Sequence, residues 1–268
     1  MYIGRFAPSP TGPLHLGSLI AALASWLDAR AAGGRWLVRI EDLDRPRCVP
    51  GAAEEILKTL EQLGLWWDGE VVYQSERQSL YEDALRRLQG QTYWCTCSRR
   101  EVADSSLGLA LDGAHIYPGT CRAAGLNTGR ALRVRTSGAL EREVGDFVLH
   151  RADGMYAYQL AVVVDDAAQD VTDVVRGADL LDSTPRQIYL QGLLGLPTPR
   201  YRHVPAAVNA AGEKLSKQTG ARAVTTNWEE IGTALSFLGQ PTAQNLDQAV
   251  RNWNRALIPA RRAVQLIG

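Results

Sequence analysis

The chain has 268 residues, 29 basic and 29 acidic side chains, and a hydrophobic fraction of 46%. This is ordinary for a globular chain and excludes a disordered or low-complexity protein, while the zero net charge argues against indiscriminate nucleic-acid binding. The longest apolar stretch, residues 16–27, is too short to span a bilayer. No basic segment followed by an apolar region opens the chain, so we expect a cytoplasmic protein without a secretory signal.

The first predicted elements alternate between strand and helix. A short strand around residues 1–7 leads through a turn rich in Pro and Gly into a helix, whose leucines recur at helical spacing over 16–27. A second strand is expected at 36–40, with helices at 53–63 and 77–88. This alternation favours an α/β domain with a mostly parallel sheet.

The pattern changes in the next segment. Residues 91–130 are rich in Cys, Gly and short polar stretches, which indicates an insertion between two halves of the sheet, and the sheet resumes at Ala131. We expect residues 162–164 to form part of a buried strand. A helix is expected to follow with Thr184 as its N-cap and Pro185 at the first helical position.

The turn before the first helix is a candidate anion site. It ends in His15-Leu16-Gly17-Ser18, where unpaired backbone amides and the helix dipole attract negative charge. His15 and Gly17 at the first turn let a phosphate approach closely. Taken alone, a histidine beside a glycine is more often a capping or core residue.

Two of the three lysines of the chain lie in one stretch, Lys214-Leu215-Ser216-Lys217. A compact ammonium group suits a point-charge contact to a phosphate better than the planar fork of arginine does. By itself this stretch would be interpreted as a solvated turn. Paired with the His15 turn, it indicates a site for a nucleotide polyphosphate.

These two stretches resemble the paired signatures of class I aminoacyl-tRNA synthetases, residues 15–18 standing for the first and 214–218 for the second. Four further runs, in the right order, resemble the glutamate-specific branch: residues 5–12, 39–44, 158–166 and 175–179. The resemblance covers roughly residues 1–225. It implies a Rossmann-like parallel sheet with a small cysteine-containing insertion and a C-terminal helical appendage.

Length distinguishes two members of that branch. A chain of 268 residues leaves no room for an anticodon-reading domain of ordinary size. The sequence therefore resembles the glutamyl-queuosine tRNA(Asp) synthetases, which are free-standing catalytic cores. The resemblance implies activation of L-glutamate by ATP without tRNA, and transfer to queuosine in the anticodon of tRNA(Asp). A truncated glutamyl-tRNA synthetase that charges the tRNA 3′ end and a non-catalytic amino-acid- or RNA-binding paralogue stay open as alternatives.

The same resemblance suggests domain boundaries. We expect residues 1–90 and 131–200 to be the two halves of the catalytic domain and 91–130 to be the insertion. Residues 201–268 hold the lysine loop and a helical region. Nothing in the sequence demands more than a monomer.

Glutamate carries two carboxylates and one ammonium group, so its pocket needs two cations and one anion. Carried over from the resemblance, Arg5, Ser9, Glu41, Tyr158 and Arg176 match the glutamate contacts of the family. An arginine fork suits a carboxylate, and Glu41, at the carboxyl end of a strand, suits the α-ammonium. Which arginine holds the side-chain carboxylate stays open, with Arg5 favoured.

The resemblance assigns catalytic roles to His15, Lys214 and Lys217, and ATP contacts to His15, Gly17, Ser18 and Lys217. The first step needs alignment of the reacting groups and stabilisation of phosphate charge, which Lys217 and Mg²⁺ bound with ATP would supply. The sequence offers no protein nucleophile for the second step.

Three of the four cysteines, Cys95, Cys97 and Cys121, fall in the insertion. In a reducing cytoplasm a Cys-x-Cys pair with a third Cys is a reasonable start for a tetrahedral zinc site, which would be structural. From chemistry alone His115 is the fourth ligand, since imidazole is the commoner donor. The resemblance points instead to Tyr117, which we adopt, with His115 as the rival. Three buried free cysteines without a metal are the alternative.

Overall fold

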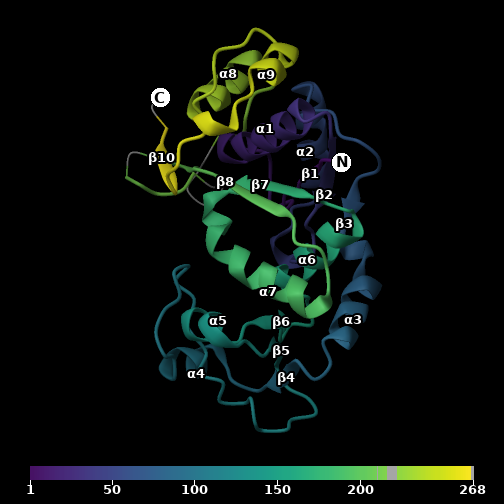
Figure 1. Cartoon of the computed structure of the whole chain (residues 1–268), viewed down its shortest axis with the longest axis vertical. Coiled ribbons are helices and arrows are strands. Elements are labelled where there is room, and N and C mark those ends of the chain that lie inside the picture. The colour runs from purple at the N-terminus through teal and green to yellow at the C-terminus, as the bar shows by residue number, and fades with distance from the viewer. Residues whose placement is uncertain (210, 216–221, 267–268) are drawn as a thin grey trace. The chain divides into compact units, whose positions relative to one another are not determined.

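The computed structural model describes residues 1–209, 211–215 and 222–266 (Figure 1). The chain forms two compact units, each built from separated segments. The first unit comprises Met1–Glu76, Asp170–Leu181 and Pro199–Gly268. The second comprises Arg77–Gln169 and Asp182–Thr198.

Parallel strands form the centre of the first unit. β1 (Ile3–Phe6) pairs with β2 (Arg35–Ile40), and β2 pairs with β3 (Val72–Tyr73). β7 (Asp173–Gly177) pairs in parallel with β8 (Arg200–Val204), and β1 also contacts β7. The expected α/β class with parallel strands is therefore confirmed.

Helix α1 (Leu16–Ala31) packs against β1, β2 and β7. Its leucines at positions 19, 23 and 27 are fully buried, and α2 (Ala52–Gln62) adds Ile56 and Leu60 to the same core. A glycine turn connects α1 to β2, and a Cβ at Gly34 would lie 2.4 Å from the carbonyl oxygen of Tyr2. Only glycine therefore lets β2 approach β1 there.

The C-terminal part of the first unit contains α8 (Trp228–Phe237) and α9 (Leu246–Asn252). The helical prediction for this region is right for both helices, but it misses β10 (Ala263–Gln265), which pairs in parallel with β9 (Ala206–Val208). Buried Asp28 on α1 anchors the region, because it accepts hydrogen bonds from Trp253 Nε1 at 2.8 Å and Arg255 Nε at 2.5 Å.

The second unit contains a three-stranded antiparallel sheet with helices around it. The strands are β4 (Thr92–Cys95), β5 (Ala131–Val134) and β6 (Val148–His150), in that order. The prediction that Ala131 resumes the interrupted sheet is wrong, since β5 pairs antiparallel with β4. The helices are α3 (Gln78–Arg87), α4 (Arg99–Asp104), α5 (Gly138–Glu143), α6 (Tyr158–Ala168) and α7 (Thr184–Leu194).

Residues 162–164 belong to helix α6, so the prediction of a buried strand there is wrong. A run that is buried on all sides has no polar alternation, and its pattern does not distinguish a helix from a strand. Buried Asp165, at the end of that run, accepts hydrogen bonds from Arg77 Nε at 2.6 Å and from the Tyr81 hydroxyl on α3 at 2.8 Å. These contacts fix α6 against α3.

The start of α7 differs from the prediction by one residue. Ser183 is the N-cap and Thr184 is the first helical residue, with Pro185 still in the first turn. Short 3₁₀ turns complete the fold at Arg45–Arg47, Gln74–Glu76, Ala178–Ser183 and Arg255–Leu257.

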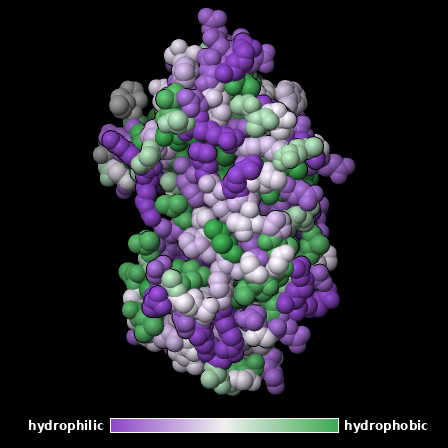
Figure 2. Space-filling view, in the orientation of Figure 1, coloured by the Kyte–Doolittle hydropathy of each residue, from purple (hydrophilic) through white to green (hydrophobic). Residues whose placement is uncertain are grey.

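No helix in the described ranges combines the length and the apolar character needed to cross a membrane. In the view of Figure 2, hydrophilic and hydrophobic residues are mixed over the visible face.

Candidate functional site

The first signature forms the N-terminus of α1. His15 is the N-cap, and its Nδ1 accepts a hydrogen bond from the backbone N–H of Ser18 at 3.3 Å. In a neutral ring Nε2 then carries the proton, so the Ser18 hydroxyl, 3.0 Å away, accepts from it. These contacts hold the imidazole over the first turn, where the helix dipole favours an anion.

The second signature lies against the first. The carbonyl oxygen of Leu215 is 3.4 Å from the position that a Cβ on Gly17 would occupy. Further along the chain, the N–H of Val224 donates to the carbonyl oxygen of Leu14 at 2.9 Å. The described residues on both sides of the lysine loop therefore contact the His15 turn. Lys217 itself lies outside the described residues.

Lys214 is described, and its Nζ lies 2.6 Å from Oδ2 of Asp179. Both side chains are partly exposed, at 52% and 34%. An exposed ion pair of this kind stabilises a fold by only about 0–1 kcal/mol. Little free energy is therefore lost when Lys214 leaves the Asp179 carboxylate for a phosphate oxygen.

Four of the five glutamate candidates lie in the first unit, at or after the carboxyl ends of parallel strands. Arg5 on β1 and Arg176 on β7 are both buried, at 3% and 4% exposure. Glu41 directly follows β2, and Ser9 is an exposed residue in the loop after β1. Open α/β sheets bind ligands at this edge. Tyr158 is the first residue of α6 and belongs to the second unit.

The loop that carries Glu41 is held at several points. The Glu41 N–H donates to the carbonyl oxygen of Pro8 at 2.9 Å, and its Oε1 lies 3.4 Å from the buried guanidinium of Arg39. The next residue, Asp42, accepts from both the N–H and the hydroxyl of Ser75, at 2.8 and 2.6 Å. These contacts fix the backbone at the end of β2, and with it the starting point of the Glu41 side chain.

Arg176 is held by side chains from β8. Its Nε donates to Nε2 of His203 at 3.3 Å, and its Cζ lies 5.1 Å from the ring centroid of Tyr201. One of its terminal nitrogens also donates to the carbonyl oxygen of Leu180, at 3.3 Å. Sequence reasoning missed His203, because its role depends on the pairing register of β7 with β8 and no local pattern reveals that register.

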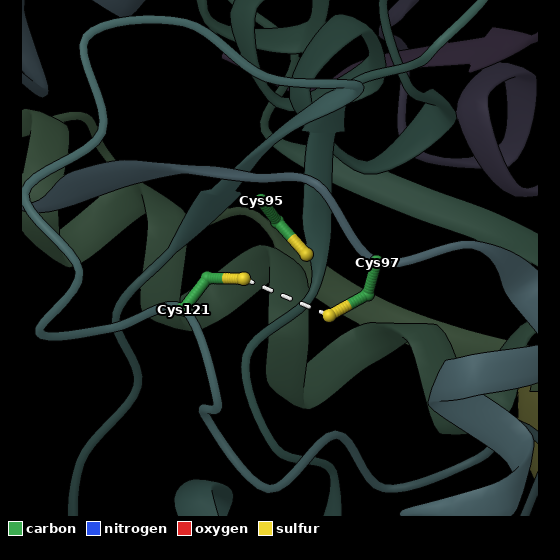
Figure 3. Close-up of side chains that lie close together, drawn as sticks. All are labelled: Cys95, Cys97 and Cys121. Atoms are coloured by element: carbon green, nitrogen blue, oxygen red, sulfur yellow. Dashed lines mark hydrogen bonds between the residues drawn. The ribbon is translucent and has the colours of Figure 1, made fainter.

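The three cysteines of the second unit point their sulfur atoms toward one another (Figure 3). The sulfurs all lie within 4.8 Å of one another, and those of Cys97 and Cys121 are 3.6 Å apart. The hydroxyl oxygen of Tyr117 is 3.4 Å from Cys95 Sγ and 3.4 Å from Cys97 Sγ. Three sulfurs and one oxygen therefore surround a common point.

This spacing fits a tetrahedral zinc ion. Zinc–sulfur bonds of about 2.3 Å and a zinc–oxygen bond of about 2.0 Å place ligand sulfurs about 3.8 Å apart and sulfur and oxygen about 3.5 Å apart. The donor set also suits a dication. Burial raises the pKa of the Cys121 thiol, but hydrogen bonds from Tyr117, Thr96 and Cys97 outweigh it and lower that pKa to about 6. Burial raises the pKa of the Cys97 thiol, so without a nearby cation the three thiols do not all lose their protons together.

The rival ligand, His115, lies elsewhere. It is exposed, and its backbone pairs with that of Leu109. Within the described ranges, its ring nitrogens are not among the ligand atoms gathered with the cysteine sulfurs.

Comparison with known proteins identifies the family. The model of the class I tRNA synthetase catalytic domain for E and Q matches residues 3–106 and 133–238. The glutamyl-Q tRNA(Asp) synthetase of Ralstonia nicotianae is 59% identical, over 97% of this chain and 90% of the relative. That of Janthinobacterium sp. is 58% identical, over 88% of this chain and 89% of the relative. The chain belongs to the glutamyl-Q tRNA(Asp) synthetase family.

Solved structures support the fold of this glutamyl-Q tRNA(Asp) synthetase family member. The glutamate-tRNA synthetase of Elizabethkingia anophelis superposes with a TM-score of 0.75 at 24% identity, covering 98% of this chain and 68% of that one. A glutamate tRNA ligase of Elizabethkingia meningosepticum, solved with its amino acid, gives a TM-score of 0.76, also at 24% identity, covering 99% and 67%. The expected class I synthetase fold is confirmed.

Proposed function

We propose that this chain activates L-glutamate with ATP, without tRNA, and transfers the glutamyl group to queuosine in the anticodon of tRNA(Asp). The observation that carries the first step is the contact of the two signatures at Gly17 and Leu215. The names of the relatives support the second step. Because ATP and tRNA are cytoplasmic substrates, we propose that the enzyme acts in the cytoplasm.

In the first step an α-carboxylate oxygen of glutamate attacks the α-phosphorus of ATP. The bond from that phosphorus to the bridging oxygen breaks, and pyrophosphate leaves with the electron pair. We assign His15, Gly17 and Ser18 to the nucleotide phosphates, and Lys214 and Lys217 to the charge that develops on pyrophosphate. Mg²⁺ carried by ATP neutralises the rest.

Glutamate itself is assigned to the five residues at the strand ends and at the start of α6. Arg5 and Arg176 take the two carboxylates, and Glu41 takes the α-ammonium group. Ser9 and Tyr158 add hydrogen bonds. Both arginines are buried, and the planar fork of a guanidinium group suits bidentate contact with a carboxylate.

In the second step a queuosine hydroxyl attacks the carbonyl carbon of the adenylate, and AMP leaves. The mixed anhydride is already an electrophile, so no protein nucleophile is required. The chain's task in this step is to hold the adenylate and to admit the anticodon loop.

We also propose a structural zinc site formed by Cys95, Cys97, Tyr117 and Cys121. The close match of the sulfur and oxygen spacing to tetrahedral geometry supports it. Bound zinc would cross-link β4 to the loop that carries Cys121, and four protein ligands leave no position for a substrate.

The first step is tested by exchange of labelled pyrophosphate into ATP. We expect exchange that requires glutamate and needs no tRNA. Lys217→Ala should slow adenylate formation about 100-fold or more while ATP binding changes little. An unchanged chemical step in pre-steady-state kinetics of that variant would refute the role of Lys217. Absence of any exchange in the unaltered chain would refute the proposed function.

A further inference from the structure

The ring of Tyr117 lies beneath a cation. Cζ of Arg133 is 4.1 Å from the centroid of that ring, a distance at which a guanidinium group is attracted to the aromatic face. Arg133 comes from β5, whereas Tyr117 lies in the loop between α4 and β5. The contact therefore joins the sheet of the second unit to the fourth residue of the proposed metal site.

The backbone aims Arg133 at this position. The pairing of β5 with β6 shifts register between Leu132 and Arg133, and such an irregularity redirects the side chain that follows it. One terminal nitrogen of Arg133 donates to the carbonyl oxygen of Asp146 at 2.8 Å. Its Nε is buried and has no hydrogen-bond partner among the described residues. A buried donor without a hydrogen bond lowers the stability of the fold. Attraction of the guanidinium group to negatively charged metal ligands nearby would offset this loss.

Tyr117 is fixed from two other sides. The N–H of Cys121 donates to its hydroxyl oxygen at 2.9 Å. Gly145 packs closely against the backbone of Tyr117, since a Cβ on Gly145 would lie 2.9 Å from both the backbone nitrogen and the backbone oxygen of Tyr117. Together with Arg133 over the ring, these contacts hold the tyrosine oxygen 3.4 Å from the sulfurs of Cys95 and Cys97.

Charge gives the arginine a second task. Three thiolates and one bound zinc dication would together carry a net charge of −1. An ionised tyrosine oxygen would make this charge more negative. The neighbouring Arg122 is already engaged by carboxylates, because its terminal nitrogens lie 2.6 Å from Asp146 and 2.6 Å from Glu141. Arg133 contacts a ligand residue directly, and its terminal nitrogen donates to the neutral carbonyl of Asp146.

We propose that Arg133 is a positioning residue of the metal site, holding Tyr117 with its oxygen toward the three sulfurs and balancing the excess negative charge of the ligands. This inference rests on the proposed zinc site. It does not depend on the glutamate and ATP assignments of the first unit.

The test measures metal binding by the full chain with no reference to its activity. Zinc affinity is determined by competition with a chromophoric chelator, and Co²⁺ replaces zinc so that its absorption bands report the geometry and the ligands. Arg133→Met removes the charge and keeps an unbranched apolar stem. Arg133→Gln removes the charge but keeps a donor for the Asp146 carbonyl. Arg133→Lys keeps the charge, and Arg151→Met is the control, since Arg151 pairs with exposed Asp153.

We expect Arg133→Met and Arg133→Gln to weaken zinc binding by about 10- to 100-fold, as loss of groups behind metal ligands does. Their Co²⁺ spectra should move toward that of Tyr117→Phe. Arg133→Lys should recover part of the affinity, and Arg151→Met should match the unaltered chain. If Arg133→Met does not fold, the zinc affinity and the Co²⁺ spectrum of Arg133→Gln test the inference instead. Affinity and spectrum equal to the unaltered chain would overturn the inference, and an unaltered chain that binds no metal would overturn the zinc site itself.

Discussion

Gly17 and Leu215 bring the two ends of the proposed nucleotide site together. The Leu215 carbonyl oxygen lies 3.4 Å from where a Cβ on Gly17 would be, and 198 residues separate the two in sequence (215 − 17). The same Cβ would lie 3.1 Å from Cε1 and 3.2 Å from Nδ1 of His15. Gly17 therefore leaves room for both the imidazole and the start of the lysine loop.

Gly17→Ala should lower activity without lowering stability. The added methyl displaces the His15 ring by a few tenths of an ångström, and because misplacement of a positioned group by about 1 Å costs about 100-fold in rate, we expect a loss of up to about tenfold. Alanine stabilises a helix relative to glycine by up to about 1 kcal/mol, so the free energy of unfolding should not fall. Pyrophosphate exchange and chemical denaturation measure the two effects. Gly232→Ala on α8 is the control, since its Cβ would meet nothing within 4 Å; equal exchange rates for both variants would contradict the role of Gly17.

His203 should affect glutamate more than ATP. Loss of a hydrogen bond to a charged group costs about 1.5–3 kcal/mol, so His203→Phe should raise the KM for glutamate about tenfold or more. His203→Gln retains an acceptor for Arg176 Nε and should stay close to the unaltered chain. Initial rates of pyrophosphate exchange against glutamate concentration test this. A similar rise in both variants, or a change confined to the KM for ATP, would show that His203 does not act through Arg176.

The two candidate fourth ligands give different outcomes. Tyr117→Phe removes an oxygen that lies 3.4 Å from two sulfurs, and should weaken zinc binding by about 100-fold or more. His115→Asn changes an exposed side chain and should retain one zinc per chain. Elemental analysis after dialysis against a weak chelator distinguishes them. Loss of zinc from His115→Asn alone would reverse the assignment.

Asp146 should make stability depend on pH. Burial raises the pKa of its carboxyl, but Arg122, Thr136 and Tyr93 outweigh it, and the pKa is lowered in the folded chain. A lowered pKa contributes stability that is present above the unfolded value of about 3.9 and is lost as pH falls through the folded value.

Asp146→Asn should therefore cost about 3 kcal/mol near neutral pH, because it leaves Arg122 without this buried partner, and less below pH of about 4. Urea unfolding at several pH values, with zinc removed, measures the difference. Asp83→Asn, which breaks an exposed pair with Arg86, should show little effect at any pH. A cost for Asp146→Asn that does not shrink in acid would contradict this account.

The sequence predicts most of the first unit because its elements have strong local signals. Leucine spacing predicts α1, and the pairing of two distant signatures predicts their contact at Gly17 and Leu215. The run at 162–164 misleads because β-branched residues buried on all sides suit either a strand or a helix. The hydrogen bonds of Asp165 with Arg77 and Tyr81, which join α6 to α3, have no local signal in the sequence.

Residues that act through pairing partners escape local patterns. His203 reaches Arg176 through the register of β7 with β8, and Arg133 reaches Tyr117 through an irregularity in β5. Neither relationship has a spacing that a sequence reveals. The cysteines are the opposite case, since their residue type and the Cys95-x-Cys97 spacing indicate a cluster before any fold is known.

The most direct test of the proposed function supplies labelled glutamate, ATP and the enzyme to tRNA(Asp) with and without queuosine. Label should enter only the queuosine-bearing tRNA(Asp), and it should stay there when the 3′-terminal adenosine is removed. Equal labelling of both tRNAs, or loss of the label with the terminal adenosine, would mean that the chain charges a tRNA 3′ end instead.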